Sequence, residues 1–283
     1  MKETDTILSK LSLALFFLLA CLPLLLGIAY ALAYSLGLTG LLSEGFSFKY
    51  FLAVITSESF YSSVWYSFRI AACSLLLAFI PAFLLSTPFI YLPRRNPPLW
   101  FYLPLSLPPL VMALIFFVLL SAAGWLSSLA AGLGFIDVPE QFPSLVNDSF
   151  GWGIIITHIF LIAPFLSLLF VRIALQERLH SLYALARTLG SGKLFFIVTI
   201  WLPILIRRGL PVFWLYFIFC FGMYEVALVN GVSYPQAFSV LVAEKLSRFD
   251  LATRPEGYAM ALIYCVAIIT ISVFVFRKRK FSV

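Results

Sequence analysis

The chain has 283 residues, of which 63% are hydrophobic and only 11% are charged, and its formal net charge is +7. Soluble domains carry about 25% charged residues, so this composition excludes a water-soluble globule. Several apolar runs of about 18 residues or more indicate a polytopic α-helical membrane protein, all-α in class. The basic residues lie in short blocks beside these runs, which predicts contact with membrane lipid and no binding of nucleic acid.

Hydropathy predicts six transmembrane helices. The first is longer than the core of about 7–15 residues in a signal peptide, so we expect it to be retained. The segment 194–204 is also apolar, and its boundary with the fifth helix stays open. The predicted spans are roughly 11–36, 64–91, 99–123, 151–174, 205–225 and 258–276.

The charges between the spans predict the orientation, because Lys and Arg concentrate on the cytoplasmic side. Fourteen of the nineteen basic residues fall on one side, and nine of the twelve acidic residues fall on the other or at its edge. Both termini are therefore predicted to be cytoplasmic, and the tail 277–283 to anchor on anionic lipid. The fourteen are Lys2, Lys10, Arg94, Arg95, Arg172, Arg178, Arg187, Lys193, Arg207, Arg208, Arg277, Lys278, Arg279 and Lys280.

The sequence shows no catalytic, metal-binding or cofactor motif, and we expect a protein that is not an enzyme. All four cysteines lie in apolar runs, as small core residues do. Three ionisable residues lie at membrane depth: Arg69, His158 and Glu225. Arg69 and Glu225 lie near the outer ends of their spans and can snorkel to water, whereas His158 is deeper and is expected to pack between helices.

The longest inner segment, 175–204, contains a predicted helix that ends at Gly190. Gly190-Ser191-Gly192-Lys193 looks like part of a phosphate-binding loop. That motif needs glycine at 187 and serine or threonine at 194, where this chain has Arg187 and Leu194. Nucleotide binding by this chain is therefore not expected.

The same segment resembles the cytoplasmic loop of permease subunits in binding-protein-dependent importers of the ATP-binding-cassette (ABC) class. Their pattern is E-A-A-x-x-x-G-x(9)-I-x-L-P, and five of its seven fixed positions match. Ala184 stands at the glutamate position and Leu185 at the first alanine position. The matching residues are Ala186, Gly190, Ile200, Leu202 and Pro203.

Other segments are similar to the same family. They are 103–111, 150–155 and 163–165, and Asn230-Gly231 followed by 234–236, the last as in permeases grouped with polyamine, ferric iron, thiamine and sulfate importers. The likeness implies a type I permease domain over 58–276, preceded by a first helix and outer loop over 1–57.

The resemblance implies a permease subunit in a bacterial or archaeal plasma membrane. Its partners would be ATP-hydrolysing subunits, a second identical or homologous permease subunit, and an extracytoplasmic solute-binding protein. The small face of the loop helix would enter the ATPase, with Arg187 and Lys193 at the rim. By the same analogy spans three to five line the path, where His158 and Glu225 are candidates.

Three alternatives stay open. The loop helix could instead lie at the lipid surface. A self-contained secondary transporter would need two halves with paired broken helices, and a membrane-embedded enzyme would need a polar cluster at one depth. The sequence does not indicate which substrate the protein transports.

Overall fold

A computed structural model describes residues 12, 14–40, 45–91, 99–138 and 141–277. All regular elements within these ranges are helical. Among the described residues, six helical stretches are long and apolar enough to cross a membrane, which confirms the predicted all-α polytopic class. Four basic residues used for the orientation (Lys2, Lys10, Arg94 and Arg95) and the tail from 278 onward lie outside the described residues.

Contacts divide the chain into two compact units. One comprises Met1–Phe60 with Leu241–Val283, and the other comprises Tyr61–Val240. The boundaries expected for a permease domain, 58–276, follow a family likeness rather than contacts, and they stay a prediction.

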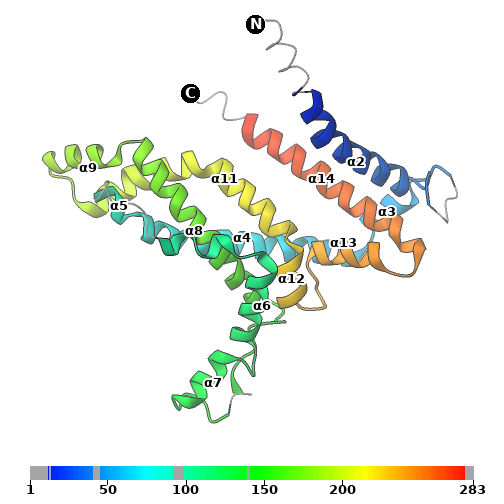
Figure 1. Cartoon of the computed structure of the whole chain (residues 1–283), viewed down its shortest axis with the longest axis horizontal. Helices are drawn as coiled ribbons and strands as arrows, with labels where there is room; N and C mark the ends of the chain where they lie inside the picture. The colour runs from blue at the N-terminus through cyan, green and yellow to red at the C-terminus, as the bar shows by residue number, and fades with distance from the viewer. Residues whose placement is uncertain (1–11, 13, 41–44, 92–98, 139–140, 278–283) are drawn as a thin grey trace, which may run out of the picture. The chain divides into compact units, whose positions relative to one another are not determined.

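The first unit pairs the two ends of the chain. It contains α2 (Leu22–Ser35), α3 (Lys49–Ile55) and α14 (Arg254–Arg277), and α14 packs along both α2 and α3 (Figure 1). Aromatic rings join α14 to α2: the ring of Tyr258 lies 4.9 Å from that of Tyr34 and 5.9 Å from that of Tyr30, between centroids.

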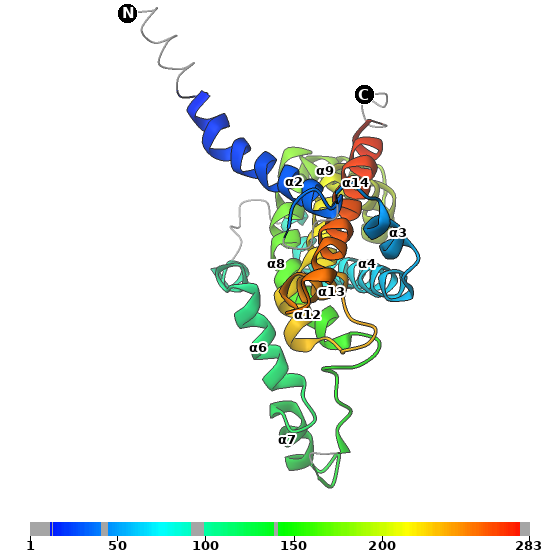
Figure 2. The same ribbon diagram turned by 90° about the vertical axis from the view of Figure 1, so that its right-hand side faces the viewer.

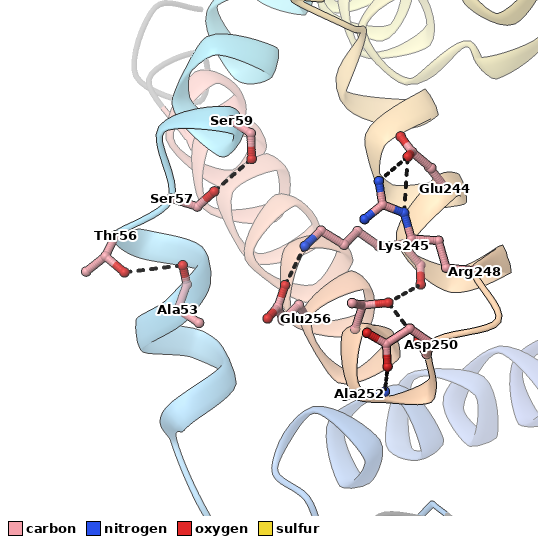
Figure 3. A network of polar contacts seen from close by, with 11 residues as sticks. Ala53, Thr56, Ser57, Ser59, Glu244, Lys245, Arg248, Asp250, Ala252 and Glu256 are labelled. Atoms are coloured by element: carbon pink, nitrogen blue, oxygen red, sulfur yellow. Dashed lines mark hydrogen bonds and ion pairs between the residues drawn. The ribbon is translucent and has the colours of Figure 1, made fainter. Parts of the chain in front are cut away.

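A polar network fixes the turn that leads into α14 (Figure 3). Lys245 Nζ lies 2.6 Å from Glu256 Oε2, and the Asp250 carboxylate accepts a hydrogen bond of 3.0 Å from the Ala252 amide. Thr253 Oγ1 donates to the Asp250 carbonyl at 2.9 Å. The bond to the Ala252 amide satisfies one of the backbone donors that a helix start leaves unpaired.

The second unit is built around α8 (Trp152–Gln176), which has the largest buried share, 56%, of the six candidate spans. Helices α5, α6, α9, α11 and α12 all contact it. Figure 2 shows α6 and α7 in succession, leading away from α8. The bounds are α4 (Glu58–Ser86), α5 (Pro88–Tyr91), α6 (Pro109–Leu120), α7 (Trp125–Gly132), α9 (Leu179–Thr188), α10 (Lys193–Phe196), α11 (Leu202–Gly222) and α12 (Tyr224–Asn230). Helix α13 (Phe238–Ser247) begins in this unit, and most of it belongs to the first.

The third and fifth predicted spans differ from the observed helices. The third was expected over 99–123, but its first residues form two short 3₁₀ turns and α6 begins only at Pro109. Pro104, Pro108 and Pro109 lack the amide protons that an α-helix interior needs. The fifth was expected over 205–225, whereas helical structure runs from Lys193 to Gly222.

In the part of the chain that the structure describes, two π-helical turns stand immediately before a leucine-proline pair. Phe17–Cys21 precedes Leu22 and Pro23, and Ile197–Trp201 precedes Leu202 and Pro203. In each turn the leucine amide donates to the carbonyl five residues earlier. A proline cannot donate, and its ring crowds the carbonyl four residues before it, so a locally wider turn accommodates it.

Candidate functional site

The helix predicted between the fourth and fifth spans is α9, and its glycine end has the bonding of a Schellman cap. The Ser191 amide donates to the Ala186 carbonyl at 2.9 Å, and the Gly190 amide donates to the Arg187 carbonyl at 3.1 Å. Gly190 has φ +82°, a left-handed conformation that glycine adopts without steric cost. The alanine–glycine spacing of the motif is therefore the spacing that caps this helix.

Around this cap the helix exposes large apolar side chains. Exposed fractions are 60% for Leu185, 79% for Leu189 and 74% for Leu194, which follows the cap. Ala184 is also exposed, and Ala186 is half-buried. A cluster of exposed leucines at the end of a helix is typical of a surface that another protein or membrane lipid covers.

The charged residues of the motif lie beside the cap. The Arg187 guanidinium donates to the Ser191 carbonyl at 3.3 Å, across the turn. Lys193 begins α10, and its Nζ lies 5.7 Å from the centre of the Tyr91 ring. The structure thus brings residues 184–193 together in one helical hairpin.

The I-x-L-P end of the motif does not join that hairpin. Ile200 lies within the π-helical turn Ile197–Trp201, and α11 begins with Leu202 and Pro203. All three residues therefore belong to the helix of the fifth span. Ile200 and Leu202 are half-buried and Pro203 is exposed. Helical structure continues from Lys193 into this span, which connects the hairpin to it without a flexible link.

His158 and Glu225 lie in different environments. His158 is 1% exposed, and its Nδ1 lies 3.2 Å from Ser74 Oγ of α4, as expected for a histidine that packs between helices. Glu225 is exposed in the first turn of α12, beyond the end of α11 rather than at the end of the fifth span. A carboxylate there also complements the helix dipole.

The Arg69 side chain is hydrogen-bonded to backbone carbonyls and does not simply extend to water. Its Nη2 donates to the carbonyls of Ser149 at 2.9 Å and Phe150 at 3.1 Å, just before α8. The guanidinium also lies 4.6 Å from the centre of the Phe150 ring. Sequence reasoning that considered only snorkelling missed this link between α4 and the start of α8.

Sequence reasoning also gave no role to three residues that connect helices. Asn230 hydrogen-bonds α6 and α8, and His180 and Tyr183 contact the end of α5. Asn230 carries a detectable signal, because a polar side chain in an apolar segment needs a partner. His180 and Tyr183 carry none, since polar and aromatic residues are ordinary on a surface helix.

An apolar groove of about 550 Å³ lies along α6 and α7, lined by Leu114, Ile115, Val118, Leu119 and Trp125. Neither His158 nor Glu225 lines it. In the described part of the chain no group of three or more His, Cys, Asp or Glu side chains could hold a metal ion.

Neither a protein-family model nor a curated protein matches this chain. Its fold is similar to that of chains from two solved bacterial ABC transporters, which confirms the predicted fold class. One similar chain belongs to a bacterial ABC transporter involved in the import of the acidic polysaccharide alginate, with TM-score 0.73, 16% identity, and coverage of 99% of this chain and 98% of that chain.

A second similar chain comes from a bacterial alginate ABC transporter in complex with an alginate pentasaccharide-bound periplasmic protein. Its TM-score is 0.70 at 17% identity, and the match covers 96% of this chain and 93% of that chain. Both likenesses extend over nearly the whole length of each chain, so they are not confined to one of the two units.

Proposed function

We propose that this chain is the permease subunit of a binding-protein-dependent ABC importer. It forms part of the path through the plasma membrane, and separate subunits hydrolyse the ATP. The observation that carries the proposal is the hairpin of α9 and α10, a capped helix with exposed leucines between the fourth and fifth spans. The shared fold supports the same function.

The hairpin suits a mechanical link between the ATPase and the spans. Leu185 and Leu189 present about three-fifths or more of their surfaces, and the ATPase would cover them. When the ATPase subunits close, α9 moves as a rigid body. Because α9 follows α8 directly and α10 continues into α11, that movement reaches two spans.

The other partners follow from the same proposal. A second permease subunit, identical or homologous, completes the path, and a solute-binding protein delivers the substrate from outside. One similar structure contains a periplasmic protein with its ligand, which supports a partner of this kind. His158 and Glu225 remain candidates for the path, and the polyamine, iron, thiamine and sulfate group remains the proposed source of substrates.

The experiment compares two glycines of the hairpin. Gly190→Asp places a side chain at φ +82°, whereas Gly192 has an ordinary φ of −76° and open space for a Cβ. The tagged chain is purified in mild detergent, and its bound proteins are tested for ATP hydrolysis and labelling by a photoreactive ATP analogue. We expect Gly190→Asp to lose the bound ATPase and Gly192→Asp to keep most of it.

Membrane insertion of both variants serves as the control, measured by the amount of chain in the membrane fraction. The proposal fails if the unaltered chain retains no ATP-hydrolysing protein. It also fails if Gly190→Asp binds the ATPase as well as Gly192→Asp does, because the capped hairpin would then not be the contact.

A further inference from the structure

Helix α9 is attached to the end of the second span as well as to its own neighbours in sequence. His180 Nδ1 lies 3.2 Å from the carbonyl oxygen of Ile90, which is 90 residues earlier in the chain. The Ile90 side chain is only 1% exposed, so the carbonyl belongs to a packed part of α5. The protonated Nδ1 tautomer donates this hydrogen bond.

Aromatic rings extend the same attachment. The ring centres of Tyr91 and Tyr183 are 4.8 Å apart in an edge-to-face arrangement, and that of Tyr183 lies 5.1 Å from Phe196 of α10. Phe196 is fully buried. Rings at these distances and angles attract one another beyond simple burial, so α5, α9 and α10 form one packed cluster. Figure 1 shows α5 beside α9.

This cluster adds a third connection to the hairpin. Along the chain α9 is joined only to α8 and, through α10, to α11. Helix α5 is the end of a different candidate span, Glu58–Tyr91, so movement of α9 would reach that span through side-chain contacts alone. A packed cluster transmits movement because its side chains interlock rather than slide.

We propose that His180 and Tyr183 are positioning residues that make the inner end of the second span move together with α9. This inference rests on the proposed function, because it needs an ATPase that moves α9. It extends that function by adding a third span to those driven by ATP.

The test measures a distance within the assembled complex. Nitroxide labels at Leu85→Cys and Ser181→Cys, both exposed and outside the cluster contacts, report the separation of α4 from α9 by pulsed electron resonance. The four native cysteines are replaced, and labelled chain is diluted with unlabelled chain so that only distances within one subunit count. Each sample is measured without nucleotide and after trapping with ATP and vanadate.

In the otherwise unaltered chain we expect the main distance to stay the same on trapping. In His180→Ala the distance should shift or broaden on trapping, and His180→Asn, whose amide can replace the Nδ1 donor, should restore the constant distance. Tyr183→Ala should behave like His180→Ala, with Tyr183→Phe as its matched control because it keeps the ring.

The inference is overturned if trapping shifts the distance in the unaltered chain. It is also overturned if neither His180→Ala nor Tyr183→Ala differs from the unaltered chain. ATPase retention is measured in every sample: a complex that keeps its ATPase and gives either result contradicts only this inference, whereas an unaltered chain without ATPase contradicts the proposed function.

Discussion

At the scale of single residues, Asn230 shows how one polar side chain organises an apolar unit. It is fully buried at the end of α12, and its Nδ2 donates to the Ala113 carbonyl of α6 at 3.2 Å and lies 3.1 Å from Thr157 Oγ1 of α8. The next residue must be small, because a Cβ on Gly231 would lie 2.3 Å from the Ala227 carbonyl oxygen. The Asn-Gly pair thus joins three helices at close range.

Asn230→Asp should destabilise the protein by about 1–3 kcal/mol, because it removes the donor and sets a carboxylate against a buried carbonyl. Thermal unfolding in detergent, followed by intrinsic fluorescence, measures the loss. Asn147→Asp is the matched control, since Asn147 is exposed and only its backbone amide bonds Asn230. Equal unfolding temperatures for the two variants would contradict the bonding role of the Asn230 amide.

At the scale of elements, ion pairs connect helices in each unit, and burial decides how much each pair contributes to stability. Glu177 at the end of α8 pairs with Arg208 of α11 at 2.6 Å, with side chains 27% and 60% exposed. In the other unit Lys245 of α13 pairs with Glu256 of α14 at 2.6 Å, with side chains 19% and 25% exposed. The two contacts have the same length but different access to water.

Glu177→Gln should cost less than about 1 kcal/mol, because exposed pairs gain little over their hydration. Glu256→Gln should cost more, because it leaves the Lys245 ammonium half-buried without its partner carboxylate. Both changes remove one charge and keep the shape, and the same unfolding assay compares them. A larger loss for Glu177→Gln than for Glu256→Gln would contradict the expectation that burial decides how much each pair contributes to stability.

At the scale of the whole molecule, the orientation in the membrane is still a prediction from the distribution of charges. The structure offers two matched positions to test it. Leu189, after α9, and Phe135, after α7, are each 79% exposed, and they fall on opposite predicted sides. In the chain without bound ATPase, a difference in labelling between them therefore reports the side of the membrane rather than local access.

In a background without the native cysteines, a membrane-impermeant maleimide should label Phe135→Cys in intact cells with a permeable outer membrane. It should label Leu189→Cys only in inside-out vesicles. For each variant we expect most of the labelling to occur in only one of the two preparations. The mass shift of the labelled chain measures it. The reverse pattern would overturn the prediction that both termini are cytoplasmic.

The sequence predicted the class, the number of spans and the helix that ends at Gly190. It misplaced the start of the third span and the limits of the fifth. Hydropathy reports how apolar a segment is, but it does not report where the helical hydrogen bonds of the backbone are interrupted. The span predicted from hydropathy therefore included Pro104 and Pro108. It also ended the fifth span near Glu225, where the backbone turns at Gly222 and begins α12.

By itself, the sequence determined the structural features that depend on residues close together in the chain. Apolar length sets the spans, and the spacing from Ala186 to Gly190 sets the cap of α9, because these interactions close within a few residues. Only the tertiary structure decided that His180 meets Ile90 and Asn230 meets Ala113, across 90 and 117 residues. Such partners depend on how helices pack, and no local pattern records which distant helix a side chain faces.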